Sequence, residues 1–163
     1  MLDLSLGLAD VLGRIGLAVL FGGLIGLERH QRNKPAGIRT MMLIALGSCV
    51  FVIAAEETLT SRASEHAADS LARVLAGIIG GVGFLGAGVI LRDAGRVAGM
   101  TTAAAIWVTA GLGVVCGLGE FGLALLSAGA AIATLVVVRV AEDRLLRGAV
   151  QKPSGADPPS ESL

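Results

Sequence analysis

Charged and aromatic side chains are scarce in this sequence. Of its 163 residues, 16% are charged and 3% are aromatic, with one tryptophan and no tyrosine. Hydrophobic residues make up 54% of the chain, and the mean hydropathy is +0.79. Such a composition has too little polar surface for a soluble domain and too much apolar surface for a disordered chain. It therefore predicts a protein that lies in a membrane.

The residue patterns of common catalytic and metal sites are also missing. Cys49 and Cys116 stand alone in apolar runs, so we expect two small buried side chains rather than a disulfide or a metal pair. His30 and His66 are far apart, and no Cys/His cluster has metal-ligand spacing. No phosphate-binding loop or nucleophile elbow occurs, and nothing pairs a nucleophile with a base. With 13 basic and 13 acidic residues, no basic surface for nucleic acid stands out. We expect neither an enzyme nor a nucleic-acid-binding protein.

Long apolar runs predict five membrane-spanning helices. Each run fits the roughly 17–25 residues that a helix needs to cross a bilayer. Residues 1–9 lack the leading positive charge of a secretory signal, so we expect them in the mature chain. The predicted fold class is all-α, a polytopic membrane helical bundle. The expected spans are about 11–27, 38–55, 74–91, a segment within 97–119, and 121–138.

The segments between these runs alternate in charge. The first loop, the third turn and the residues after the last span are basic, whereas the second loop is acidic and the fourth turn is nearly uncharged. Because Lys- and Arg-rich loops favour the cytoplasm, this pattern predicts an outside N-terminus and an inside C-terminus. We expect residues 1–147 to form the transmembrane domain. Residues 148–163, rich in proline and serine, are expected to form a disordered cytoplasmic tail.

Small residues mark the helix faces that are expected to pack. Between Arg73 and Arg92 the chain is uncharged and rich in glycine, which would weaken a soluble helix by roughly 1 kcal/mol per glycine. In a membrane, glycine instead lets two helices approach closely. The third helix is therefore predicted to be the packing centre of the bundle, with Trp107 filling space beside it. The predicted packing positions are Gly22, Gly26, Gly77, Gly81, Gly83, Gly86 and Gly88.

Charged side chains gather where the first span meets the first loop. They either set the depth of the helix and pack the loop, or bind a partner, a lipid phosphate or an ion. Arg14 has Asp10 four residues earlier and is expected to extend toward the interface beside that local acidic partner. The candidate residues at the first loop are Glu28, Arg29, Lys34 and Arg39, and Arg92 is expected to emerge on the same side of the membrane.

Acidic and hydroxyl side chains supply weaker candidates. Glu56, Glu57 and Asp69 of the second loop either hold Mg2+, which prefers oxygen ligands, or form a solvated loop. Thr101 and Thr102 either hydrogen-bond between helices or line a path through the membrane. Mg2+ is thus left open as a ligand, and no other cofactor is expected.

Two stretches of the chain resemble the MgtC/SapB family of bacterial inner-membrane proteins. They are GLIGLERHQRNKPAGIRT at 23–40 and GGVGFLGAGVILRDAGRVAGMTTAAAIW at 80–107, and the resemblance extends over roughly residues 10–145. It implies a multi-pass plasma-membrane protein of about five spans. It also implies links to growth in low magnesium, to survival inside host cells and to restraint of the ATP synthase.

The chain departs from the pattern of that family at several positions. Many members carry glutamate, histidine and glutamine where His30, Met41 and Gly77 stand here, so this chain has fewer polar groups in its membrane core. The best-known members continue into a soluble C-terminal domain, whereas only a short tail is expected after the last span here.

Two functions remain open on the sequence. The first is a non-enzymatic regulator that lies in the bilayer and binds another integral membrane protein. For that partner the resemblance implies the membrane sector of the ATP synthase or a magnesium pump, and a homo-oligomer stays open. The second is a small transporter or channel for Mg2+ or another ion, served by backbone carbonyls of a glycine-rich helix. The first is favoured because the core lacks the buried charges that a cation path usually needs.

Overall fold

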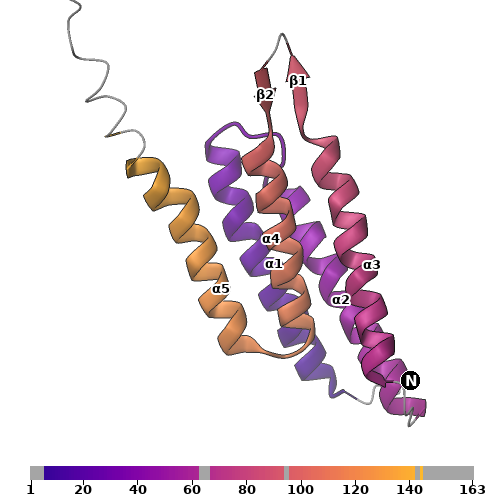
Figure 1. Cartoon of the computed structure of the whole chain (residues 1–163). Helices are drawn as coiled ribbons and strands as arrows, with labels where there is room; N and C mark the ends of the chain where they lie inside the picture. The colour runs from indigo at the N-terminus through magenta and orange to yellow at the C-terminus, as the bar shows by residue number, and fades with distance from the viewer. Residues whose placement is uncertain (1–5, 63–66, 94–95, 142–143, 145–163) are drawn as a thin grey trace, which may run out of the picture. The chain divides into compact units, whose positions relative to one another are not determined.

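Helices account for nearly all of the described chain in the computed structural model (Figure 1). The structure describes residues 6–62, 67–93, 96–141 and 144, without the side chains of 59–62, 67, 91–93 and 96. Among these residues, five helices are long and apolar enough to cross a membrane. The predicted all-α class and the five spans are confirmed. The helices are α1 (Leu8–Gln31), α2 (Ile38–Arg62), α3 (Ala67–Gly88), α4 (Met100–Gly117) and α5 (Phe121–Ala133), which continues as a π-helical turn, Thr134–Val138.

A short antiparallel hairpin joins α3 to α4, where the sequence predicted only a turn. Its strands are β1 (Leu91–Asp93) and β2 (Arg96–Ala98), with Leu91 opposite Ala98. Gly99 then adopts φ 92°, and a Cβ there would strike the carbonyl oxygen of Val89. Only glycine accommodates both constraints, so the chain turns from the hairpin into α4 within one residue.

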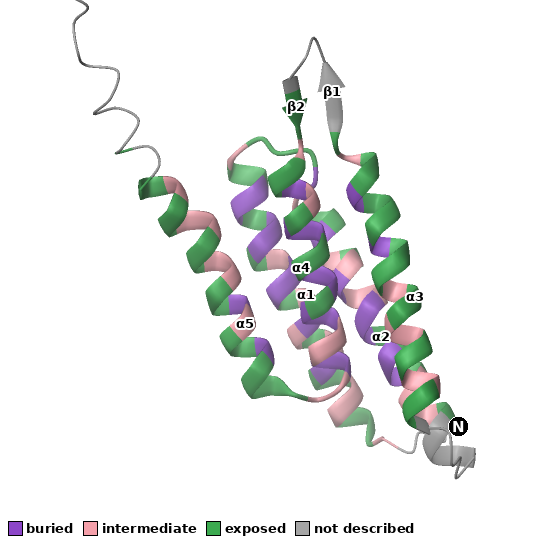
Figure 2. Ribbon diagram, viewed as in Figure 1, coloured by how far each residue is buried: buried purple, intermediate pink, exposed green. Residues whose placement is uncertain are grey.

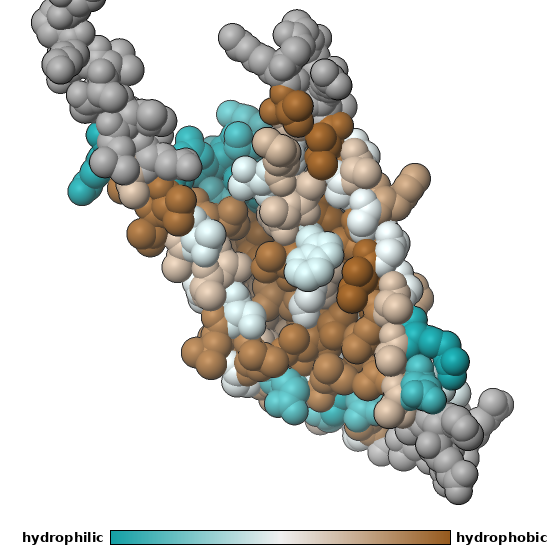
Figure 3. All heavy atoms as spheres, in the orientation of Figure 1, coloured by the Kyte–Doolittle hydropathy of each residue, from teal (hydrophilic) through white to brown (hydrophobic). Residues whose placement is uncertain are grey.

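The core of the bundle lies between α1, α2 and α4. Figure 2 shows buried residues concentrated on these three helices and sparse on α3. Each contributes one apolar face with helical spacing, and their fully buried side chains include Ile25, Met41, Ile106 and Leu112. Both cysteines are free and buried, as expected from their apolar surroundings. The outer surface is apolar across the middle of the face in Figure 3 and hydrophilic toward its ends, as a membrane-spanning bundle requires.

Glycines of α1 and α4 make the closest helix contacts. A Cβ at Gly22 would lie 2.7 Å from the Met41 carbonyl oxygen, and one at Gly26 would lie 2.6 Å from Ile38 Cα. On α4, a Cβ at Gly113 would strike the Ala45 carbonyl, and one at Gly117 would lie 2.8 Å from Val52 Cβ. These contacts bring α1 and α4 against the backbone of α2. Gly22 and Gly26 were predicted from the sequence, whereas Gly113 and Gly117 were not.

The prediction that the third helix is the packing centre is wrong for this chain. Of the apolar window of α3 only 11% is buried, against 50% for α4. Gly86 contacts Ala103, but a Cβ at Gly77, Gly81, Gly83 or Gly88 would meet no atom outside its own helix within 4 Å. Trp107 is 55% exposed and does not fill space beside α3. Glycine content shows how closely a helix can be approached, but not which helix approaches it.

The chain forms two compact units, Met1–Ile132 and Ala133–Leu163. The first holds the core of α1, α2 and α4, with α3 beside it. The buried residues of α5 in this unit are Ala124 and Ala128, four residues apart on one face. The predicted tail at 148–163 lies outside the described residues, so its disorder and the boundary at 147 stay predictions.

The loop between α1 and α2 lies at the same end of the bundle as the hairpin, and the turn between α4 and α5 lies at the opposite end (Figure 1). The orientation with N-terminus outside and C-terminus inside stays a prediction from loop charge. Reporter fusions after residues 33, 94 and 150 are expected to report the cytoplasm, and those after 64 and 118 the outside. An inside signal at residue 64 would contradict this orientation.

Candidate functional site

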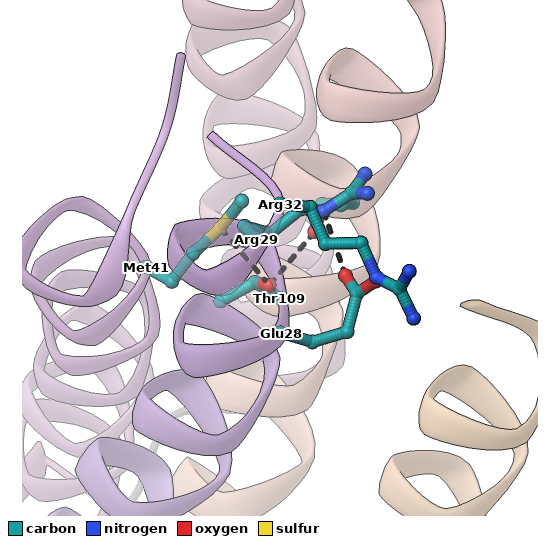
Figure 4. Close-up of polar contacts among 6 residues, drawn as sticks. Glu28, Arg29, Arg32, Met41 and Thr109 are labelled. Carbon is teal, nitrogen blue, oxygen red and sulfur yellow. Dashed lines mark hydrogen bonds and ion pairs between the residues drawn. The ribbon is translucent and has the colours of Figure 1, made fainter. Parts of the chain in front are cut away.

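Glu28 joins two arginines at the end of α1. Its Oε2 accepts a hydrogen bond from Arg29 Nε and its Oε1 accepts one from Arg32 Nε, each at 2.9 Å (Figure 4). The Glu28 and Arg29 side chains are 9% and 4% exposed. Among the described residues, the buried Nη1 of Arg29 has no hydrogen-bond partner. This group, the Glu28 cluster, thus places one carboxylate against two guanidinium groups at one end of the core.

The backbone after α1 explains why these charges are enclosed. Asn33 adopts φ 52°, and its N–H donates to the His30 carbonyl at 3.0 Å. The Lys34 N–H donates to the Arg29 carbonyl at 3.0 Å, which completes a Schellman motif with asparagine in the left-handed position. The loop then folds back over Gly26 and buries Ala36. The Glu28 cluster therefore supports this loop from within.

The other basic candidates of the first loop lie outside. Lys34 and Arg39 are exposed, and neither makes an ion pair with a described side chain. The backbone of Arg92 lies in β1 at the same end of the bundle, and its side chain is outside the described residues. Of the predicted charged candidates, the geometry leaves Lys34 and Arg39 available to a partner and encloses Glu28 and Arg29.

Met41 and Thr109 contact each other inside the core, near the Glu28 cluster. The Thr109 hydroxyl donates to the Ala105 carbonyl at 2.7 Å and lies 3.5 Å from Met41 Sδ (Figure 4). Both residues have 0% exposure, so the position that departs from the family pattern at Met41 is buried inside the core. Thr102 is also buried, whereas Thr101 is exposed, so these two threonines do not line one path.

A second charged group, the Arg14 cluster, lies at the opposite end of the core. Arg14 Nη1 donates to Glu56 Oε2 and to the Gly117 carbonyl, both at 2.6 Å. Arg14 Nε lies 2.8 Å from Asp10 Oδ2, without hydrogen-bond alignment. The Arg14 residue is only 8% exposed. The expected local acidic partner, Asp10, is confirmed. Arg14 is however buried rather than extended into the interface, and its side chain joins α1, α2 and the end of α4.

The weak metal candidates do not form one site. Glu56 binds Arg14, Glu57 Oε1 accepts the Leu6 N–H at 2.8 Å, and Asp69 is exposed in the first turn of α3. Among the described residues, no group of three or more His, Cys, Asp or Glu side chains could hold a metal ion. Mg2+ therefore has no candidate site of that kind in the described part of the chain.

An apolar groove of about 850 Å³ runs between α2 and α3, with Ile106 of α4 also lining it. Gly47 on α2 and Gly77 and Gly81 on α3 widen it because they carry no side chain. Arg39 is the charged residue that lines this groove in the described structure. The sequence marked Gly77 and Gly81 as packing positions, but nothing in it indicated that they would face an open groove.

A different face of α3 carries a regular run of small residues, the outward stripe. Its members recur at i, i+4, i+7 and i+11, so they share one side of the helix. All four are exposed, and none of them lines the groove. They are Ala76, Gly80, Gly83 and Ala87.

Comparison with known proteins identifies one matching family and several relatives of similar sequence. A model of the MgtC family matches residues 15–144. The chain is 42% identical over 128 residues to protein MgtC of Salmonella typhimurium strain LT2, covering 78% of this chain and 52% of that protein. It is 46% identical over 120 residues to protein SrpB of Synechococcus elongatus, covering 68% and 65%. It is 42% identical over 134 residues to protein MgtC of Brucella abortus strain 2308, covering 82% and 50%. The chain thus spans half to two thirds of the length of these relatives. No solved structure was found to match it.

Proposed function

Because this chain belongs to the MgtC family and is a multi-pass protein of the bacterial inner membrane, we propose that it regulates another integral membrane protein by binding it. The regulator is non-enzymatic. The resemblance that led to the family points to the membrane sector of the ATP synthase or a magnesium pump as the partner. It also points to low magnesium and survival inside host cells as the conditions in which binding acts.

The outward stripe on α3 is the observation that carries this proposal. A Cβ at Gly80 or Gly83 would meet no atom outside its own helix within 4 Å, so the chain does not use this face for its own packing. Contact with lipid tails does not require small residues, whereas a second helix gains van der Waals contact when the two backbones approach. The stripe therefore fits a membrane-spanning helix of the partner.

Exposed charge at one end of the bundle supports the same proposal. Lys34 and Arg39 are exposed there, and a cation at the membrane surface fixes the depth at which an acidic partner segment binds. Arg29 is only 3% exposed and bonded to Glu28, so it acts by holding the loop rather than by touching the partner.

Filling the outward stripe tests the proposal. The double substitution Gly80→Leu and Gly83→Leu is expected to reduce co-purification of the partner about tenfold or more, because the leucines separate the two backbones. The phenotype in low magnesium is expected to be lost with it. Expression and membrane insertion should be retained, since both positions are open. Co-purification from membranes of cells grown in low magnesium, with the two proposed partners detected by antibody, provides the measurement.

A matched control comes from α1. Gly13 and Gly16 also have no atom outside their own helix within 4 Å, so Gly13→Leu with Gly16→Leu adds the same bulk to another exposed face. This variant should bind the partner normally. Equal binding by the stripe variant and the control would contradict the proposal. Flux of Mg2+ through proteoliposomes that contain the wild-type protein alone would replace it with the transporter function.

A further inference from the structure

We propose that the groove between α2 and α3 binds an anionic phospholipid, with one acyl chain in the groove and the phosphate at Arg39. The lipid belongs to the leaflet at the end of the bundle that carries Lys34 and Arg39, called the basic end below. This site is separate from the outward stripe, because the groove is lined by Gly77 and Gly81 and the stripe contains Gly80 and Gly83. The inference shares Arg39 with the proposed regulatory function but does not depend on that function.

The groove is longer than one leaflet and shorter than the whole bilayer core. Along α2 its lining extends from Arg39 to Phe51, which at 1.5 Å per residue is about 18 Å. Along α3 it extends from Val89 back to Val74, about 22 Å by the same rise. The hydrocarbon of one leaflet is about 15 Å thick, half of the bilayer core. At about 18–22 Å the groove therefore has room for one acyl chain along its length, but falls short of the roughly 30 Å of bilayer core that a spanning helix of a partner protein has to cover.

The chemistry of the lining fits an acyl chain. Leu43 and Phe51 form exposed apolar edges on α2, and Val82 and Ile106 are buried against the inner side. The polar residues that line it are Arg39 and Thr40 at one end, and Ser48. A volume of about 850 Å³ lies within the range of roughly 300–1,000 Å³ that is usual for small-molecule sites.

Charge at the mouth selects an anionic headgroup. Arg39 lines the groove at the basic end, is exposed, and has no ion pair with a described side chain. No Asp or Glu is among the residues that line the described groove. A guanidinium binds a phosphate through parallel hydrogen bonds, and the neighbouring Thr40 hydroxyl offers a further donor. A phosphate without acyl chains would leave the apolar part of the groove unused.

Native mass spectrometry of the purified full chain tests this inference. The protein is equilibrated in detergent with equal amounts of phosphatidylglycerol and phosphatidylcholine that carry the same acyl chains. The wild type is expected to retain phosphatidylglycerol preferentially. Arg39→Gln is expected to lower that preference about fivefold, the contribution of one basic side chain near an anionic surface. Arg73→Gln removes an exposed cation from the other end of α3 and should leave the preference unchanged.

Filling the groove tests the acyl-chain part separately. Gly77→Leu with Gly81→Leu is expected to abolish tight retention of both lipids, whereas Gly80→Leu with Gly83→Leu adds the same bulk outside the groove and should retain them. All four positions are open, so each variant is expected to fold, which its thermal midpoint verifies. Wild-type retention of phosphatidylglycerol by the groove variant would overturn the site. So would equal effects of Arg39→Gln and Arg73→Gln, or a wild-type dimer that only the groove variant dissociates.

Discussion

Gly113→Leu is expected to prevent α4 from packing against α2 and to leave little folded protein. A Cβ at this position would strike the Ala45 carbonyl oxygen and lie 2.9 Å from Ser48 Cβ. The obstacle is mainly backbone, which cannot rotate away as a flexible side chain can. Overpacking a core costs typically about 1–3 kcal/mol, and a forced separation of two helices places this change at or above the upper end. The thermal midpoint in detergent should therefore fall by about 10 °C or more.

Gly111→Leu is the control that separates the effect of added bulk from the effect of contact with α2. Gly111 lies two residues away on the same helix, is exposed, and would meet no atom outside its helix within 4 Å. The same substitution there should leave the midpoint close to that of the wild type. Gly88→Leu on α3 should be equally mild, since that position is open too. Equal loss of stability at Gly111 and Gly113 would show that bulk alone, rather than contact with α2, governs the effect.

Removing both carboxylates of the Arg14 cluster is expected to have the second largest effect. In the double variant Asp10→Asn and Glu56→Gln, the Arg14 side chain, 9% exposed, keeps its bond to the Gly117 carbonyl but loses both anions. A buried charge left without its ion-pair partners costs about 3–5 kcal/mol. Because Asp10 and Glu56 are each 37% exposed, the reverse change, Arg14→Met alone, leaves two carboxylates that water can reach. It should therefore cost less.

A rescue experiment separates charge from packing in this cluster. Adding Arg14→Met to the double variant removes the uncompensated cation and should recover part of the lost stability. The measurement is the thermal midpoint of the wild type, Arg14→Met, the double variant and the triple variant, all in the same detergent. If the triple variant is no more stable than the double variant, the cost arises from lost contacts rather than from a buried charge.

The spans of this chain could be predicted because hydropathy is a local property. The uncharged run between Arg73 and Arg92, for example, is long and apolar enough to span a membrane, whatever it packs against. The same argument gives the loops and their charge. It does not give neighbours: Gly113 fits against Ala45, which is far away in the sequence, and no local signal marks the contact. The glycines of α3 are as numerous as a packing face requires, and all of them except Gly86 still remain open.

In the candidate site, too, contacts within one helix could be predicted from the sequence and contacts between helices could not. Glu28 and Arg32 are four residues apart on one helix, so their ion pair could be read from spacing. Their enclosure depends on Asn33 adopting a left-handed conformation that returns the loop over Gly26. The bond between Arg14 and Glu56 needs the antiparallel helices α1 and α2 to pack in one register, which the sequence does not specify.

The position of α4 has a consequence for how the protein is made. Synthesis delivers α3 to the membrane before α4, yet α4 completes the core with α1 and α2 while α3 packs beside it. Until α4 arrives, the α2 backbone at Ala45 and Cys49 lacks the glycines that fit against it. Gly99 holds the start of α4 close to Val89, just after the end of α3, so α4 stays beside α3 once it has inserted. Helix α3 is therefore in the membrane before α4, with few contacts to the core. During that interval the nascent chain exposes the part of the core that α4 later covers.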